Sequence, residues 1–160
     1  MEEHKAIIER FYTAFQRGDF TTMQSLYSRD AYFYDPVFQE LNGLEAGKMW
    51  EMLLRRSKDL KISLGKVEAT PEGGTAIWKA QYPFGKKARR VTNRIKATFI
   101  IQDGLIVRHE DNFDLRKWMN QALGWQSKYL GGLPFMHRQV QKKAQESLKK
   151  YISRHHPKTI

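Results

Sequence analysis

Cysteine is absent from this 160-residue sequence. The chain therefore forms no disulfide, no thiolate metal site and no cysteine nucleophile. No apolar run approaches the roughly 18–20 residues that a membrane-spanning helix needs. The opening segment MEEHKAIIERF is acidic and amphipathic, which is not typical of a signal peptide. Together these absences predict a cytoplasmic protein.

Acidic residues are scarce relative to basic ones, with 17 Asp and Glu against 28 Lys and Arg, a net charge of +11. Residues 125–160 contain eight basic residues and one acidic residue, and the stretch KKARRVTNRIK (86–96) contains six basic residues. Such clusters suit an anionic lipid, a nucleic acid or an acidic partner. They equally suit solvated faces that aid solubility.

The composition that remains indicates one globular domain. The chain is 41% hydrophobic, 12% aromatic and 28% charged, which excludes disorder and low complexity. A chain of this length corresponds to about one domain and buries roughly two-thirds of its unfolded surface.

Apolar residues at helical spacing predict three helices in the first part of the chain: over 3–17, from Phe20 through Tyr27, and over 44–57. Between the last two, AYFYD (31–35) alternates like a strand that stops at Pro36. The segment 37–43 is then a short connection or an edge strand.

After residue 60 the apolar pattern changes to a period of two. It predicts four strands and one further helix, over 60–70, 75–84, 91–101, 105–113 and 114–123. Three helices followed by a meander predict an α+β domain, with the helices packed on one face of a curved antiparallel sheet.

Three polar residues interrupt the apolar faces of the predicted strands. Asn93 lies among apolar residues of one strand, and His109 and Asp111 lie among those of the next. Because register fixes which face each side chain occupies, all three are expected to point inward. A buried carboxyl group needs a partner or a raised pKa, and polar groups converging on an apolar concave face suit a binding pocket.

Each of these residues also has a purely structural interpretation. Asp111 suits an N-cap for the helix at 114–123, and His109 suits a core histidine with satisfied hydrogen bonds. Asn93 suits a hydrogen bond to a neighbouring loop. Asp35, before Pro36, suits the start of a turn.

Two segments carry a resemblance to known families. The run RFYTAFQRGDFTTMQSLYSRDAYFYDP (10–36) resembles the opening of ketosteroid isomerases and SnoaL-like proteins, which belong to the nuclear transport factor two superfamily. The run GLIVRHEDNFDLRKWMNQALG (104–124) is similar to the closing strand and helix of SnoaL-like proteins. The resemblance implies a cone-shaped, cystatin-like fold over 1–124 and a homodimer. The superfamily includes isomerases, cyclases, epoxide hydrolases, dehydratases and inert binding modules, so fold alone does not give function.

The match to ketosteroid isomerases is partial. Asp35 falls where that family keeps its proton-shuttling aspartate, which makes it a candidate base. Phe11 falls at the position of the oxyanion-hole tyrosine, with Tyr12 next to it, and the family's second donor falls near Ala97 or Thr98. Without both donors an enolate loses its main stabilisation, so steroid isomerase activity is not expected.

SnoaL-like cyclases are held to use an acidic residue on the last strands, with no metal or cofactor. Asp111 matches that position best, with His109 two residues earlier on the same face. Such a pair can move a proton near neutral pH. Epoxide hydrolases of the superfamily need an Asp–Arg–Asp set, but Arg94 and Arg108 are expected to face the other way.

Residues 125–160 extend beyond the minimal domain. The first part, WQSKYLGGLPF, reads as a loop with apolar anchors that suit closing a pocket, and the rest reads as a basic amphipathic helix. The apolar stripe of that helix suits packing on its own domain or on a second copy. Its basic faces suit peripheral contact with an anionic membrane or a partner protein. His155 and His156 lack a third ligand nearby and make a weak metal signal.

The sequence therefore predicts a SnoaL-like enzyme that performs cofactor-free acid/base chemistry, of isomerase or cyclase type, on an apolar carbonyl compound. Its candidate catalytic residues are Asp111, His109 and Asp35, and its candidate pocket residues are Asn93, Tyr12, Trp50 and Trp78. The alternative is a non-catalytic module that binds a small apolar ligand and uses its basic tail for membrane or protein contact. No base-reading motif is present, which argues against a nucleic-acid partner.

Overall fold

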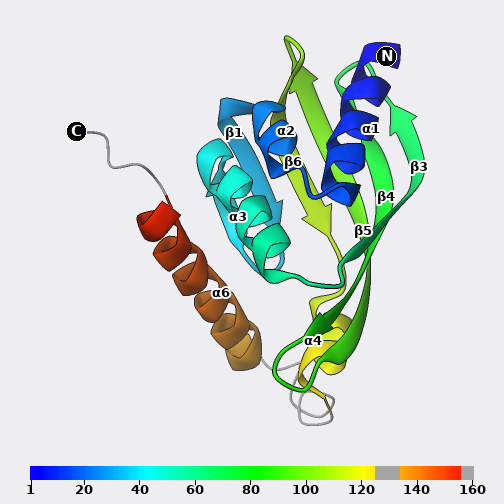
Figure 1. Ribbon diagram of the computed structural model, residues 1–160. Coiled ribbons are helices and arrows are strands. Elements are labelled where there is room, and N and C mark those ends of the chain that lie inside the picture. The colour runs from blue at the N-terminus through cyan, green and yellow to red at the C-terminus, as the bar shows by residue number, and fades with distance from the viewer. Residues whose placement is uncertain (125–133, 156–160) are drawn as a thin grey trace.

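Helices cover the inner face of a curved sheet in the computed structural model of the protein, which describes residues 1–124 and 134–155 (Figure 1). Three helices precede most of the sheet: α1 (Glu2–Gln16), α2 (Phe20–Ser25) and α3 (Gly43–Arg56). Two more follow it: α4 (Leu115–Leu123) and α6 (Pro134–His155). None of the helices in these residues is both long and apolar enough to span a membrane.

The sheet has six strands in the order β2-β1-β6-β5-β4-β3. Their bounds are β1 (Tyr27–Asp35), β2 (Gln39–Asn42), β3 (Lys61–Ala69), β4 (Gly73–Phe84), β5 (Arg89–Gln102) and β6 (Leu105–Asn112). All neighbouring strands are antiparallel except β1 and β6, which run parallel. The predicted α+β fold is confirmed, with a mixed sheet because β1 joins the meander at β6.

Two local predictions are wrong. Tyr27, placed at the end of the second helix, is instead the first residue of β1, because α2 ends at Ser25. In the predicted strand over 105–113, simple alternation from His109 and Asp111 also places Leu105 and Val107 inward. In the structure Ile106 is fully buried and Leu105 is exposed. The cause is a register shift between β5 and β6 at Ile100 and Ile101, which reverses the faces at the start of β6.

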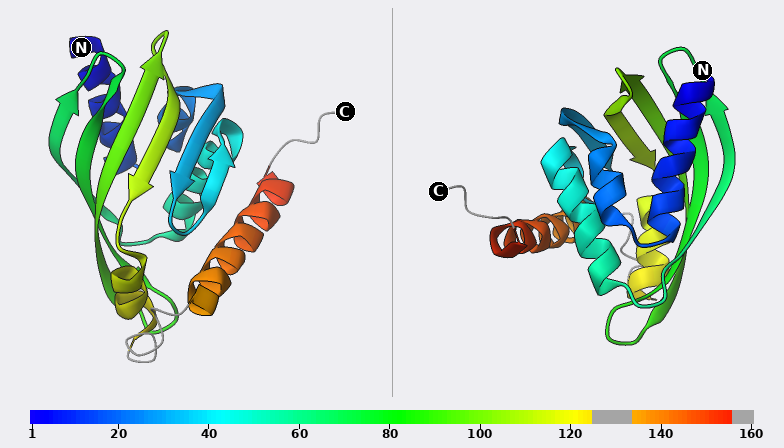
Figure 2. Two further views of the ribbon diagram at one scale, coloured as in Figure 1. Left: turned by 180° about the vertical axis from the view of Figure 1, so that it is seen from behind. Right: turned by 45° about the horizontal axis from the view of Figure 1, so that its top comes forward.

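The core lies between the sheet and helices α1, α2 and α3, as the tilted view of Figure 2 shows. Apolar residues of α1 and α3 supply its helical side, and alternate residues of β4 and β5 supply its sheet side. α3 begins with a capping box between Asn42 and Glu45, and a Cβ at Gly43 would collide with the carbonyl oxygen of Ser28. That glycine therefore allows α3 to start directly against β1.

The two last helices lie at the margins of the sheet. β6 ends at Asn112, opposite Lys96, so β5 continues beyond it with β4 on one side only, and α4 packs on this part of β5. α6 lies beside α3, where Leu148 and Tyr151 are buried (Figure 2). The apolar stripe of the predicted C-terminal helix therefore packs on its own domain. Residues 125–133 of the predicted pocket-closing loop and His156 lie outside the described ranges. The end of that predicted loop is wrong, because Pro134 and Phe135 begin α6 and Phe135 is exposed.

Candidate active site

His109 and Asp111 lie side by side on the inner face of β6, as the alternation predicts. His109 is 0% exposed and Asp111 is 2% exposed. His109 Nε2 lies 3.0 Å from Asp111 Oδ1. Trp78 Nε1 donates to the same carboxyl oxygen over 3.3 Å. The structure thus brings two candidate catalytic residues and one candidate pocket residue together.

The other side of His109 is held by a residue that the sequence analysis missed. His109 Nδ1 lies 2.7 Å from the hydroxyl oxygen of Tyr27. Trp50 Nε1 donates to that same hydroxyl oxygen over 2.9 Å. The hydroxyl oxygen already accepts from Trp50, so its proton is free to go to His109 Nδ1. With the proton of His109 on Nε2, the ring donates to Asp111 Oδ1 and accepts from Tyr27, so this tautomer satisfies both ring nitrogens and the Tyr27 hydroxyl.

Strand pairing explains why this polar chain fits inside an aromatic core. His109 lies opposite Phe33 of β1 and opposite Phe99 of β5, and its ring stacks on Phe99 with a centroid distance of 4.3 Å. Asp111 lies opposite Ala97, whose small side chain leaves room beside the carboxyl group. Phe11, at the expected position of the oxyanion-hole tyrosine, and Ala97, one of the two residues expected near the second donor, both pack around this pair.

One oxygen of Asp111 is left for another partner. Both hydrogen bonds to this carboxyl group end on Oδ1. Oδ2 makes no hydrogen bond to the residues that the structure describes. An acceptor that is oriented by two fixed donors and still has a free oxygen suits proton transfer at that oxygen.

Tyr12, predicted as a pocket residue, supplies an unused donor nearby. Its hydroxyl is the one fully buried side-chain polar atom of the described residues that lacks a hydrogen-bond partner. Burial raises the pKa of Tyr12 well above its usual value, and the neighbouring charge of Asp111 raises it further. A buried hydroxyl without a partner is costly, so it calls for a ligand oxygen or a water in the working protein.

Asp35 lies at the end of β1, where the chain turns into β2. Its Oδ1 accepts hydrogen bonds from the backbone amides of Val37 at 2.8 Å and Phe38 at 2.6 Å. Burial raises the pKa of Asp35 to about 7; the Phe38 and Val37 amides oppose that rise, and the charge of Asp111 adds to it. Asp35 thus both shapes the turn, as its structural interpretation predicts, and changes charge near neutral pH.

A second tyrosine connects Asp35 with α4. Trp118 of α4 donates from Nε1 to the hydroxyl oxygen of Tyr82 over 2.6 Å. Burial raises the pKa of Tyr82; the Trp118 hydrogen bond lowers it and the charge of Asp35 raises it. α4 therefore covers the end of the sheet where Asp35 lies.

The structure also tests the predicted helix cap, the position of Asn93 and the Asp–Arg–Asp set. Asp114, not Asp111, caps α4, because its Oδ1 accepts from the amide of Lys117. Asn93 is half-buried on β5, and its side chain makes no hydrogen bond to the described residues. Arg108 is directed away from the core, over the ring of Tyr32. An Asp–Arg–Asp arrangement is therefore not formed around Asp111 by the described residues.

The predicted catalytic residues lie apart from two hollows of the described surface. These hollows have volumes of about 650 and about 240 Å³, and neither is lined by Asp111, His109 or Asp35. Within residues 1–124 and 134–155, no three His, Asp or Glu side chains cluster as metal ligands. The polar chain of Trp50, Tyr27, His109, Asp111 and Trp78 is an internal feature of the core.

A curved mixed sheet with helices on its inner face defines the protein as an α+β domain of the cone-shaped class that the resemblance implies. The sequence profile of the SnoaL-like domain matches residues 8–109, so the chain belongs to the SnoaL-like family. No curated protein matches the sequence closely enough to add a relative.

Several solved structures share the fold. An LEH-like epoxide hydrolase of M. tuberculosis is 18% identical, with a TM-score of 0.66 over 82% of this chain and 98% of the other. A proposed polyketide cyclase of Xanthomonas campestris pv. campestris is 18% identical, with a TM-score of 0.61 over 76% and 97%. A protein of Catenulispora acidiphila DSM 44928 with a ketosteroid isomerase-like fold, in complex with trimethylamine, is 9% identical, with a TM-score of 0.65 over 74% and 93%. At these identities the likeness establishes the fold alone.

Proposed function

We propose that the protein catalyses acid/base chemistry on a small apolar carbonyl compound, with Asp111 as the central acid/base group. The observation that carries this proposal is the buried carboxyl of Asp111, oriented through Oδ1 by His109 and Trp78 and free at Oδ2. An isomerisation or a cyclisation of aldol type needs such a group beside a carbon acid. The kinship with a proposed polyketide cyclase supports the same class.

Three side chains would share the steps of proton transfer. Asp111 would take a proton from the carbon next to the carbonyl group at Oδ2, with His109 as a positioning residue. Tyr12 would donate a hydrogen bond to the carbonyl oxygen as negative charge develops there. Asp35, which holds a proton below its pKa of about 7, would give that proton to carbon or oxygen, and exchange with solvent would return the proton from Asp111 to Asp35. Two carboxyl groups in different surroundings are a frequent way to divide acid and base roles.

Proton exchange tests the proposal without a known substrate. Apolar ketones and β-diketones are incubated with the protein in D₂O, and loss of the α-proton signal is followed by NMR. Asp111→Asn keeps an oxygen that accepts from Trp78 and His109, so the variant should fold, and the rate should drop by about 100-fold or more. Glu110→Gln is the matched control, because it changes the neighbouring carboxyl on the opposite face of β6. Equal rates in both variants would disprove the proposal.

A second candidate is a ligand-binding module without catalysis. It is favoured by the complete burial of His109 and by the mutual satisfaction of Trp50, Tyr27 and His109, which suits a structural role. This candidate predicts that apolar ligands stabilise the protein without any proton exchange. It also predicts that Asp111→Asn leaves ligand affinity unchanged.

A further inference from the structure

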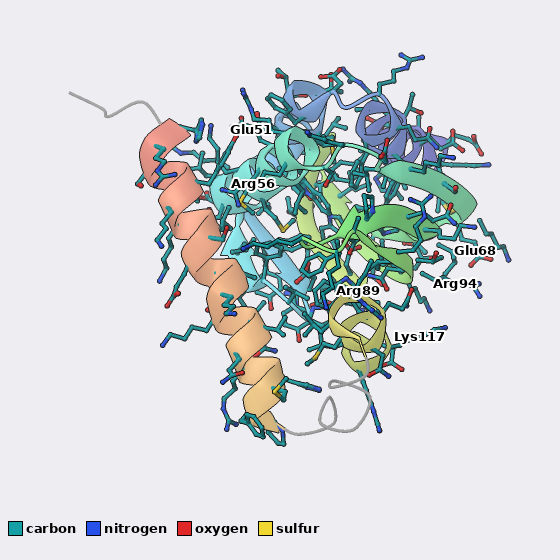
Figure 3. All side chains as sticks on the ribbon, turned by 60° about the horizontal axis from the view of Figure 1, so that its bottom comes forward. Glu51, Arg56, Glu68, Arg89, Arg94 and Lys117 are labelled. Carbon is teal, nitrogen blue, oxygen red and sulfur yellow. The ribbon has the colours of Figure 1, made fainter. Side chains whose placement is uncertain are left out.

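A basic hollow lies outside the core, between β5 and α4. It has a volume of about 650 Å³ and is lined by Arg89, Arg90, Thr92, Lys117, Asn120 and Gln121. Figure 3 shows Arg89 and Lys117 beside α4, whereas Arg94, further along β5, is not among the residues that line the hollow. Among the described residues, the lining of the hollow contains three cations and no carboxylate, and its other members carry only hydroxyl and amide groups.

Arg89 is fixed in this hollow by its surroundings. Its Nε donates to the carbonyl oxygen of Gln121 over 3.0 Å. Its guanidinium group also lies over Gly124, where a Cβ would come within 3.1 Å of the guanidinium carbon. Gly124 has a φ of +87° and no side chain, so it allows this close approach. A guanidinium group that is already immobilised loses less entropy when it binds an anion.

Gln121 joins the two walls of the hollow. Its Oε1 accepts from the backbone amide of Thr92 over 2.7 Å, and its Nε2 lies 3.4 Å from the carbonyl oxygen of Lys117. The Thr92 amide lies on the part of β5 that extends past the end of β6, so no strand is there to accept it. One side chain thus replaces a missing strand partner and holds α4 against β5.

We propose that this hollow binds the phosphate group of a small phosphorylated molecule. Two guanidinium groups and one ammonium group converge there with neutral donors, which is the donor set that a phosphate dianion needs. A concave site of limited extent fits one such group better than a polymer.

The proposal is independent of the acid/base function. The residues of the hollow belong to β5 and to one side of α4, whereas Trp118, which contacts Tyr82 near Asp35, belongs to another side of that helix. Loss of proton exchange in Asp111→Asn says nothing about this hollow. Loss of phosphate binding says nothing about Asp111.

Calorimetry with pyrophosphate at constant ionic strength tests the site. The full chain should bind pyrophosphate, and Arg90→Gln and Lys117→Gln should each weaken binding by about fivefold or more, since each removes one charge-assisted contact. Arg94→Gln is the matched control, because it removes the same charge from the same strand outside the hollow. Its affinity should equal that of the wild type, and melting temperatures confirm that all variants fold.

Two further ligands distinguish binding of a small phosphorylated molecule from binding of a nucleic acid. ADP should bind with at least the affinity of pyrophosphate, whereas a 12-nucleotide single-stranded RNA should bind no better per phosphate group. The proposal is overturned if pyrophosphate does not bind at constant ionic strength. It is also overturned if Arg94→Gln weakens binding as much as Arg90→Gln, or if RNA binds far more tightly, because an extended basic surface would then be responsible.

Discussion

Asp35 is the residue whose protonation should be easiest to detect in the stability of the fold. Its pKa of about 7 in the folded protein lies well above the value of roughly 4 expected for an unfolded chain. Between these values the folded state keeps a proton that the unfolded state releases. The stability that this proton provides is therefore complete below about pH 4 and is lost as the pH rises through 7.

Asp35→Asn should remove this loss, because an amide oxygen can accept from Val37 and Phe38 without carrying charge. The unfolding free energy of the variant, relative to wild type, should rise by roughly 2–3 kcal/mol between pH 5 and pH 8. Urea unfolding at the two pH values measures the difference. Asp59→Asn, at an exposed site, should show no such trend, and a difference that does not depend on pH would contradict the assigned pKa.

Tyr12 and Tyr27 should respond in opposite ways to the loss of their hydroxyl groups. The Tyr12 hydroxyl is buried without a partner, so Tyr12→Phe should raise the unfolding free energy by about 1 kcal/mol. The Tyr27 hydroxyl bonds to His109 and Trp50, so Tyr27→Phe should lower it by about 1–3 kcal/mol. Denaturant unfolding of both variants checks the pair, and equal losses would mean that Tyr12 has a partner in solution. A gain in stability at Tyr12 accompanied by a loss of proton exchange would fit a functional donor.

At the scale of elements, the turn after β1 is held by side chains from the far end of the sequence. Gln141 of α6 donates to the carbonyl oxygen of Pro36 over 3.1 Å, and Gln145 donates to that of Phe38 over 3.3 Å. The amides of this same turn bond to Asp35. α6 therefore stabilises the conformation in which two amides lower the pKa of that carboxyl group.

The double variant Gln141→Ala/Gln145→Ala should loosen the turn. Amides over 37–39 should exchange faster with solvent, and the pKa of Asp35 should rise further because its opposing hydrogen bonds weaken. Hydrogen exchange and the carbon-13 shift of the Asp35 carboxyl group measure the two effects. Lys142→Ala/Glu146→Ala, on the exposed face of α6, serves as the control. An unchanged carboxyl titration in the glutamine variant would contradict a positioning role for α6.

The sequence predicted elements whose pattern is local and missed contacts that depend on distant segments. The inward direction of His109 and Asp111 follows from alternation on one strand, so it was predicted. Tyr27 was missed because its place depends on the parallel pairing of β1 with β6, about 80 positions away. The register shift at Ile100 follows from that same long-range packing and not from local spacing.

The fit of α6 was equally hidden from the sequence. The apolar stripe of α6 predicted that this helix packs on another surface. That surface is α3, and a polar contact between the two helices fixes where they meet. Tyr151 donates its hydroxyl to Glu51 Oε2 over 2.5 Å. Although burial raises the pKa of Glu51, hydrogen bonds from Tyr151 and Gln24 and the charge of Lys48 lower it overall. No periodicity in either helix indicates that these residues meet.

For the whole molecule, the net charge of +11 has a structural counterpart on the outer face of the sheet. Seen from behind in Figure 2, this face carries no helix of the described chain. Lys79 of β4 lies directly opposite Arg94 of β5. Like charges in directly opposed positions on neighbouring strands repel one another, and salt screens the repulsion.

Arg94→Glu should convert this repulsion into attraction. The melting temperature at low salt should rise by about 1–3 °C, and the gain should shrink in about 0.5 M NaCl. Lys86→Glu, in the exposed turn between β4 and β5, changes the net charge by the same amount without forming a cross-strand pair. A rise in Arg94→Glu alone would assign the effect to the Lys79 pair, because general relief of positive charge acts on both variants. An equal rise in both would instead show that self-repulsion of the whole molecule dominates.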